Sequence, residues 1–221
     1  MNRFDRRRRD RRGAVSTSSR SADPPPTTVL RLREPGDLVA AVPHLVGFVP
    51  TDSLVLAALH DVDGRPRLGA VVRVDLPPPE HAAEAVGACA RRMGRREPDD
   101  VALVVIGGGD GDGGDGDGED GDGDPPRVDL VELVEAMFGA ARVPVRSRLW
   151  TPRIEKGAPW RCYPPCDCRG LVPDPHASTT AAAMTVLGHV TFDSRAEIEE
   201  LVRPHPAAGS AHRRRRTCVR R

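Results

Sequence analysis

The chain has few aromatic residues: two Trp, one Tyr and four Phe among 221 residues. No apolar run approaches the roughly 18 residues that a membrane-spanning helix needs. No apolar signal-peptide core follows the N-terminal arginines. The five cysteines are odd in number, and without a secretion signal they do not indicate a disulfide framework. We therefore expect a cytoplasmic protein with no membrane partner.

Charge is distributed in blocks, although the formal net charge is only +1. Residues 1–20 carry +6, residues 212–221 carry another +6, and residues 110–124 carry −8, which leaves −3 on the rest. Segments of such biased composition bury too little apolar surface to fold. We predict a disordered Arg/Pro-rich arm over 1–27, a disordered Gly/Asp insertion over 107–126 and a disordered Arg-rich tail over 205–221.

Residues 28–204, which include the Gly/Asp insertion, predict a single α/β domain. Asp63-Gly64 lies between two apolar runs, 53–60 and 68–76, and this pattern is typical of a β-hairpin. Both runs are apolar on both faces, as in strands that are covered on two sides. Further strands are expected at 27–33, 101–106 and 143–150. Helices are expected at 38–46, with Asp37 as N-cap, and at 80–94, 128–141, 177–187 and 194–202.

Two helical crossovers connect the strands at 68–76, 101–106 and 143–150. If both crossovers are right-handed, these three strands run in the same direction. The predicted fold class is therefore a three-layer α/β domain with a mixed, mainly parallel sheet that includes one hairpin, flanked by disordered tails.

This topology predicts a binding site at one edge of the sheet. Open α/β sheets bind ligands outside the carboxyl ends of their parallel strands. The antiparallel strand brings its N-terminal end to the same edge. The candidate binding residues at this rim are Asp52, Ser53, Arg73, Asp75, Trp150 and Arg153.

The hairpin also predicts which rim residues face each other. With Asp63-Gly64 as the two-residue turn, Asp52 faces Asp75 and Leu54 faces Arg73. Opposed carboxylates destabilise a sheet unless a cation lies between them. Arg73 either forms a structural ion pair there or helps to line a pocket for a cationic or hydroxylated ligand, or for a metal. Ser53 is a candidate nucleophile only if His44 can activate it.

Three thiols form the motif Cys162-x3-Cys166-x-Cys168 in a Pro-rich segment. Such a cluster resembles a metal-binding knuckle, but zinc usually takes four ligands, and the fourth would be His176, Asp174 or Cys218, none of which lies at a familiar spacing. A redox pair and unligated loop cysteines are the alternatives. Zinc is the one cofactor that the residues suggest.

Both tryptophans and the single tyrosine lie within 14 residues, at Trp150, Trp160 and Tyr163. They either plug the end of the sheet or form a stacking wall for a planar or sugar ligand.

The stretch from Leu30 to Val55, LRLREPGDLVAAVPHLVGFVPTDSLV, is similar to the opening of an actinobacterial family called domain of unknown function 4192. The resemblance covers roughly residues 28–204. It implies a cytoplasmic protein of high-GC Gram-positive bacteria and implies no activity. Family members usually lack a long Gly/Asp tract, which favours an insertion here. The other segments that carry the likeness are Arg73-Val74-Asp75-Leu76-Pro77, Arg148-Leu149-Trp150, the cysteine-bearing segment and Ser194-Arg195.

Three functions follow as hypotheses. The first is a non-catalytic binding or regulatory module that takes a small polar ligand or a protein partner at the polar-aromatic rim. The second is a hydrolase-like or metal-dependent enzyme that uses Asp52 and Asp75. The third is weak, non-specific association with nucleic acid through the Arg-rich arms, because arginines neutralise phosphates.

Overall fold

The computed structural model describes residues 34–95, 97–109 and 125–203. The strand predicted at 27–33, the arm over 1–27, the core of the Gly/Asp insertion and the tail over 205–221 lie outside these ranges. Those expectations therefore stay predictions.

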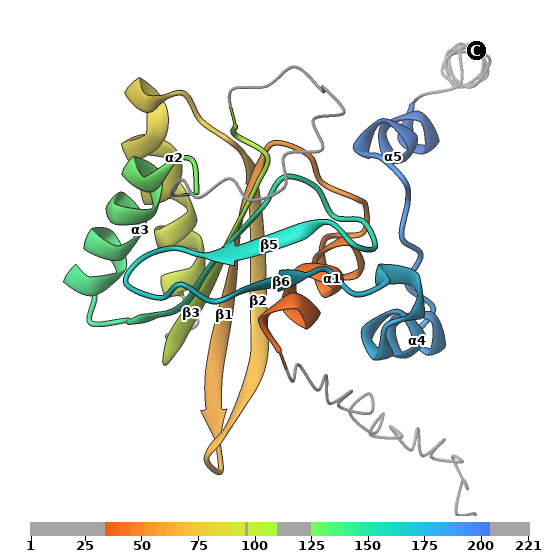
Figure 1. The fold of residues 1–221 in the computed structure, drawn as a ribbon, viewed down its shortest axis with the longest axis horizontal. Helices are drawn as coiled ribbons and strands as arrows, with labels where there is room; N and C mark the ends of the chain where they lie inside the picture. The colour runs from red at the N-terminus through yellow and green to blue at the C-terminus, as the bar shows by residue number, and fades with distance from the viewer. Residues whose placement is uncertain (1–33, 96, 110–124, 204–221) are drawn as a thin grey trace, which may run out of the picture.

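The strands form one six-stranded sheet in the order β2-β1-β3-β4-β5-β6 (Figure 1). Only β3 and β4 pair in parallel, and the other neighbouring strands pair antiparallel. The sheet is mixed and includes the predicted hairpin, but antiparallel pairs outnumber the parallel pair, because β1 separates β2 from β3 and because β5 and β6 extend the sheet. The strands are β1 Ser53–Val62, β2 Arg65–Asp75, β3 Asp100–Ile106, β4 Val145–Thr151, β5 Pro159–Cys162 and β6 Arg169–Leu171.

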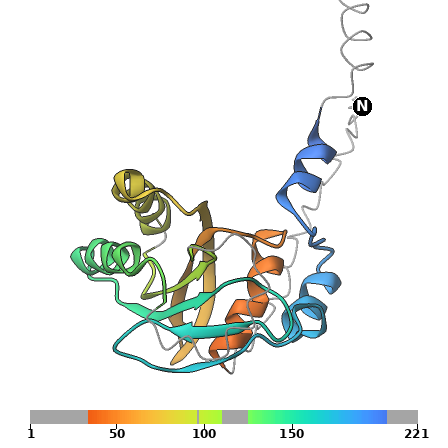
Figure 2. The ribbon, with the colours of Figure 1, turned by 45° about the horizontal axis from the view of Figure 1, so that its top comes forward.

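Helices cover both faces of the sheet (Figures 1 and 2). On one face, α2 and α3 bury one apolar cluster, which includes Leu56, Leu103 and Phe138. On the other face, α1 buries a second cluster around Val55 and Val104. This confirms the three-layer α/β class. The helices are α1 Pro35–Val46, α2 Pro79–Gly94, α3 Val128–Ala140, α4 Thr179–Val186 and α5 Arg195–Val202, with a 3-10 turn η1 at Pro175–Ala177.

Helix α1 begins earlier than its sequence pattern predicts. Glu34 is the N-cap, and Asp37 is the third helical residue, whose carboxylate accepts the Glu34 N–H at 3.2 Å. Proline suits the first helical position because the N–H that it lacks would be unpaired there. The predicted N-cap role of Asp37 is therefore wrong, although the residue still stabilises this end of α1.

The hairpin register differs from the prediction over half of its length. Near the turn His60 pairs with Arg67, as expected, but beyond a bulge Ser53 pairs with Asp75. Gly69 and Ala70 of β2 lie opposite the single residue Ala58 of β1. A bulge adds one residue to one strand and so shifts every later pair by one. The prediction that Asp52 faces Asp75 and Leu54 faces Arg73 is wrong for this reason.

The strand directions agree with the topological prediction. β2 and β3 both run antiparallel to β1, and β3 runs parallel to β4, so β2, β3 and β4 point the same way. Their carboxyl ends meet at one edge, where Leu76 N donates to Asp52 O at 2.8 Å and Gly107 N donates to Thr151 O at 3.0 Å. We call this edge the rim.

Helix α5 stands away from the sheet in both ribbon views (Figures 1 and 2). It has no buried residue. Within the described part of the chain, no helix combines the length and apolarity needed to cross a membrane.

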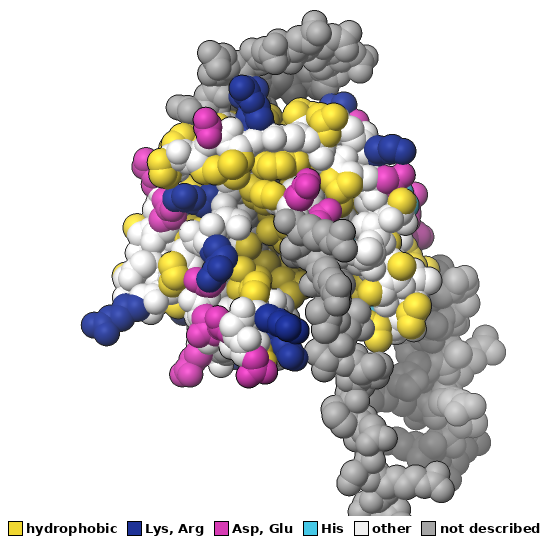
Figure 3. Space-filling view, turned by 60° about the horizontal axis from the view of Figure 1, so that its bottom comes forward, with side chains coloured by type: hydrophobic (Ala, Val, Ile, Leu, Met, Phe, Trp, Pro, Cys, Tyr) yellow, Lys and Arg dark blue, Asp and Glu magenta, His cyan; other side chains and the backbone are white. Residues whose placement is uncertain are grey.

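Apolar side chains reach the surface in several places. Figure 3 shows hydrophobic side chains gathered in a hollow that charged side chains border. The large hydrophobic residues that are most exposed follow residue 170 in the chain. They are Leu171 (67%), Val186 (87%), Val190 (65%), Leu201 (69%) and Val202 (74%).

Candidate rim site and cysteine cluster

Asp52 connects β1 to the segment that leaves β3. Its φ of 36° lies in the left-handed region, which Asp tolerates better than most residues. Its carboxylate Oδ1 accepts the Gly108 N–H at 3.3 Å. A Cβ on Gly107 would lie 2.3 Å from that oxygen, so only glycine fits there. Asp52 is exposed, and its role in this arrangement is to hold the rim backbone.

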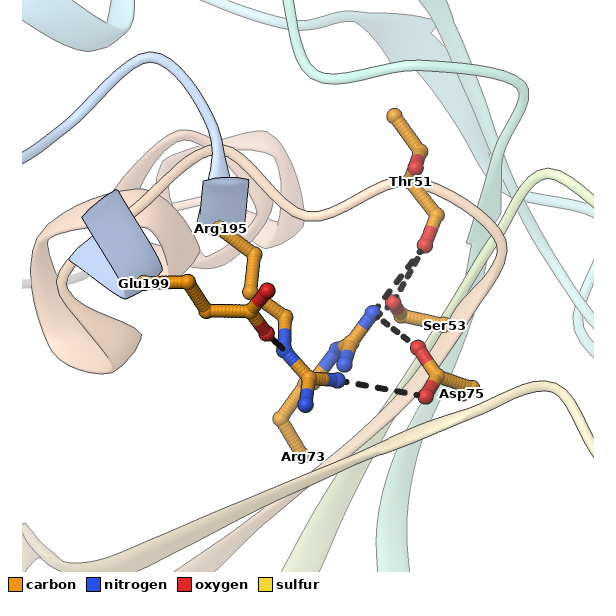
Figure 4. Close-up of polar contacts among 6 residues, drawn as sticks. All are labelled: Thr51, Ser53, Arg73, Asp75, Arg195 and Glu199. Atoms are coloured by element: carbon orange, nitrogen blue, oxygen red, sulfur yellow. Dashed lines mark hydrogen bonds and ion pairs between the residues drawn. The ribbon is translucent and has the colours of Figure 1, made fainter. Parts of the chain in front are cut away.

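Arg73 is the centre of a polar cluster on the α1 side of the sheet (Figure 4). Its Nε donates to Ser53 Oγ at 2.8 Å, and a terminal nitrogen lies 2.5 Å from Asp75 Oδ1. The guanidinium also lies 5.4 Å from the centre of the Phe48 ring, within cation–π range. Only 13% of the Arg73 side chain is exposed. The structure therefore brings Ser53, Arg73 and Asp75 together, and we call these three residues the rim clasp.

The rim clasp holds helix α5. Arg195 Nη1 lies 3.4 Å from Asp75 Oδ2, while Arg195 Nε donates to Glu199 at 2.8 Å (Figure 4). Asp75 thus accepts from one arginine of the sheet and one of α5. Its side chain is 68% exposed, so the contact with Arg195 is a surface ion pair.

Ser53 is not set up as a nucleophile. Its side chain is fully buried, and its hydroxyl donates to Thr51 O at 2.5 Å while it accepts from Arg73. His44, the predicted activating base, has one ring nitrogen 2.8 Å from Thr191 Oγ1 and the other 2.9 Å from Pro175 O. His44 therefore joins α1 to the C-terminal segment.

Trp150 reaches the rim from the opposite face of the sheet. Its indole Nε1 donates to Gly107 O at 2.9 Å, and its ring packs against the cluster under α2 and α3. Arg153 forms an exposed ion pair with Glu155. Neither of these two predicted site residues contacts the rim clasp through any interaction seen among the described residues.

The other two residues of the predicted aromatic group, Trp160 and Tyr163, are buried. Trp160 is 6% exposed and Tyr163 is 1% exposed. The Tyr163 hydroxyl donates to Pro126 O at 2.5 Å, and burial raises the pKa of Tyr163. Trp160 packs on Gly36 and Gly170, where an added Cβ would lie within 3.0 Å of the ring. Neither ring is free to stack on a ligand.

The cysteine motif forms a compact cluster in the β5–β6 hairpin. The sulfur atoms of Cys162, Cys166 and Cys168 all lie within 4.8 Å of one another. Cys162 ends β5, and its N–H donates to Cys168 O at 2.8 Å, just before β6 begins. No disulfide links any of them.

The three thiols differ in acidity. Burial, with added hydrogen bonding to Cys166, raises the pKa of Cys162 to about 12. The Cys168 backbone N–H stabilises the sulfur of Cys166 and lowers the pKa of that thiol. The hydrogen bond to Cys166 raises the pKa of Cys168. Two of the predicted fourth ligands, Asp174 and His176, do not join this group; the Asp174 carboxylate accepts the His176 backbone N–H at 3.0 Å. The third, Cys218, lies outside the described residues.

Sequence reasoning missed Phe48 and Arg195 as neighbours of the rim clasp. Phe48 lies in the loop between α1 and β1, where its ring meets Arg73, and its bridge with Phe192 brings the C-terminal segment to the rim. Arg195 follows that bridge directly. The Ser194-Arg195 helix start was the one available signal, but nothing in its local pattern indicates a contact with Asp75, which lies 120 residues away.

The structure defines a three-layer α/β domain with a satisfied polar clasp at its rim and a thiol cluster in an edge hairpin. The family model described as "Domain of unknown function (DUF4192)" matches residues 35–221, and the chain belongs to this family. No curated protein matches it. No solved structure matches it.

Proposed function

We propose that this domain is a non-catalytic binding module and that α5 docks a protein partner next to the rim. The observation that carries the proposal is that α5 has eight residues and none of them is buried. Helices this short are marginal in water without packing on one face. A partner that covers the apolar side of α5 would supply that packing.

Three apolar residues of α5, Ile198, Leu201 and Val202, share one side of the helix at helical spacing. We call this side of α5 the arm surface; it is distinct from the Arg-rich arms at the ends of the chain. Leu201 and Val202 are 69% and 74% exposed, whereas Ile198 is half-buried. Exposed apolar groups that lie together mark interaction sites more often than isolated ones do.

Charge around the arm surface favours a basic partner. Residues 193–203 and the adjoining ends of β1 and β2 carry six acidic residues, against the three arginines Arg73, Arg195 and Arg203, of which Arg73 is largely buried. The acidic residues are Asp52, Asp75, Asp193, Glu197, Glu199 and Glu200. A partner segment with apolar side chains beside lysines or arginines complements this surface.

A protein partner is favoured over a small polar ligand at the rim clasp. Ser53 and Arg73 already make hydrogen bonds to each other, to Thr51 O and to Asp75, so a polar ligand would have to displace them. The hydrolase-like or metal-dependent alternative, which uses Asp52 and Asp75, has less support, because Asp52 is bonded to the rim backbone and Asp75 is paired with two arginines. A cytoplasmic setting and an actinobacterial source are part of the proposal. Free Cys162, Cys166 and Cys168 suit a reducing compartment, and the family likeness suggests the source.

The test titrates the full chain with a labelled synthetic helical peptide that carries leucines on one face and lysines on the other. Fluorescence anisotropy should show binding that weakens at least about tenfold when Leu201 and Val202 are both changed to Ser, a loss of about 1.4 kcal/mol. Val186→Ser removes an even more exposed apolar side chain from α4 and should leave binding unchanged. All variants keep residues 110–124, so the difference between them isolates the arm surface.

Three outcomes would overturn the proposal. The double variant could bind the peptide as well as the native chain does. A matched peptide with glutamates in place of lysines could bind equally. Finally, sedimentation could show a dimer that the double variant lacks, which would make a second copy of the chain the occupant.

A further inference from the structure

We propose that Cys162, Cys166 and Cys168 bind one zinc ion through three thiolates and leave its fourth coordination position open. This site is separate from the arm surface and does not depend on the proposed partner. It lies in the β5–β6 hairpin, whereas the arm surface lies on α5.

The distances between the sulfur atoms suit a single ion. Zinc bonds to thiolate at about 2.3 Å, so two thiolates of a tetrahedral site lie about 3.8 Å apart. The three sulfur atoms already lie within 4.8 Å of one another. Closing on an ion therefore requires movements of at most about 1 Å in each S–S separation, which side-chain rotation supplies.

The hairpin explains why thiols that are close in sequence converge. The Cys162 N–H donates to Cys168 O, so these two residues face each other where the loop between β5 and β6 begins and ends. The connecting segment returns Cys166 over this pair. Tyr163 fixes the start of the segment, because its buried hydroxyl is bonded to Pro126 O. The sulfur atoms of the facing residues Cys162 and Cys168 and of the loop residue Cys166 are thus close together before any ion binds.

The donor set selects the class of ion. Three sulfur ligands favour zinc or another thiophilic ion over magnesium and calcium, which take oxygen ligands. Iron–sulfur clusters usually take four cysteines, whereas Cys89 of α2 is buried in the core, so the described residues offer only three at this place. Among the described residues, no further Cys, His, Asp or Glu joins this group of three. A zinc ion held here would therefore keep one position for water or for an incoming donor.

The test uses the full chain, purified under reducing conditions and loaded with zinc or with cobalt as a spectroscopic substitute. Elemental analysis should give one zinc per chain after a chelator wash. Cobalt should give the sulfur-to-cobalt charge-transfer absorption typical of thiolate ligation. Cys162→Ser, Cys166→Ser and Cys168→Ser should each weaken zinc affinity by at least about 100-fold, beyond the 10–100-fold typical of outer-shell changes.

Cys218→Ser is the matched control, since it removes a thiol outside the trio and should leave both stoichiometry and affinity unchanged. X-ray absorption should count three sulfur neighbours and one lighter neighbour around the zinc. Zinc below one equivalent in the native chain would overturn the proposal, and so would unchanged affinity in any variant of the trio. Loss of zinc in Cys218→Ser, or four sulfur neighbours, would overturn the three-thiolate coordination. Circular dichroism of each variant separates loss of the site from loss of the fold.

Discussion

Gly107 is the residue at which the rim is most tightly determined. Its φ of +73° is a conformation that L side chains rarely adopt, and Asp52 Oδ1 fills the space that a Cβ would need. The next residue, Gly108, donates its N–H to the same carboxylate. Two glycines and one aspartate thus close the end of β3 against the start of β1.

Gly107→Ala should therefore destabilise the domain by about 1–3 kcal/mol, because it combines backbone strain with a collision at Asp52. Gly109→Ala is the control. No atom lies within 4 Å of a Cβ at that position, so its effect should stay within about 0.5 kcal/mol. Chemical denaturation measures both values. Equal stability of the two variants would contradict the role given to Gly107.

At the residue scale, the sequence predicted which residues lie at the rim better than it predicted which of them are in contact. Asp52, Ser53, Arg73 and Asp75 were grouped because they lie at the ends of neighbouring strands, and all four do lie at the rim. Their pairing was wrong because one extra residue in β2, at the Gly69–Ala70 bulge, is invisible in an apolar pattern. A glycine inside a strand was the available signal.

Among the elements, α5 has the fewest attachments to the domain. Arg195 joins it to Asp75, and the backbone of Phe192 just before it pairs with Gly47 and Val49. Exposed ion pairs contribute little to global stability. They can still set the position of a short helix.

Asp75→Asn should increase hydrogen exchange in residues 195–202, because it removes the exposed ion pair with Arg195. It should also lower the thermal midpoint, because it removes the charge that faces the largely buried Arg73. Glu199→Gln removes the other partner of Arg195 but keeps the contact with Asp75, so it should change exchange less. Exchange measured by mass spectrometry compares the two. Equal exchange in both variants would show that Asp75 does not hold α5.

Elements with long apolar runs or helical spacing were predictable, and the two shortest strands, β5 and β6, were not. β1, β2 and β3 and the helices α2 and α3 fall close to their predicted bounds, because burial on both faces or at helical spacing leaves a strong pattern. β5 has four residues and β6 has three, and the cysteine segment interrupts them. Strands this short carry too few positions to show an alternation. Their partners, such as Leu149 for Cys162, come from tertiary packing.

At the scale of the whole molecule, the strongly charged segments fall outside the described residues. The third predicted function, association with nucleic acid, depends on two of these segments. Residues 1–20 hold eight arginines, and residues 212–221 hold six. Counterion release makes binding through such arms depend steeply on salt.

Removing residues 1–20 should therefore abolish or greatly reduce any affinity for a 20-base-pair DNA. In the full chain that affinity should fall steeply between about 50 and 200 mM salt. Fluorescence anisotropy at several salt concentrations provides the measurement. Binding that survives the truncation at low salt would place the contact on the domain or on the C-terminal arginines.

The described residues that border 110–124 on both sides are held by contacts with the rest of the domain. Asp52 holds the first border through Gly108, while Tyr163 and Pro77 hold the second through Pro126 and Arg127. Because these contacts are made by residues outside 110–124, we expect that foreign sequence grafted between Gly109 and Pro125 would leave both apolar layers intact.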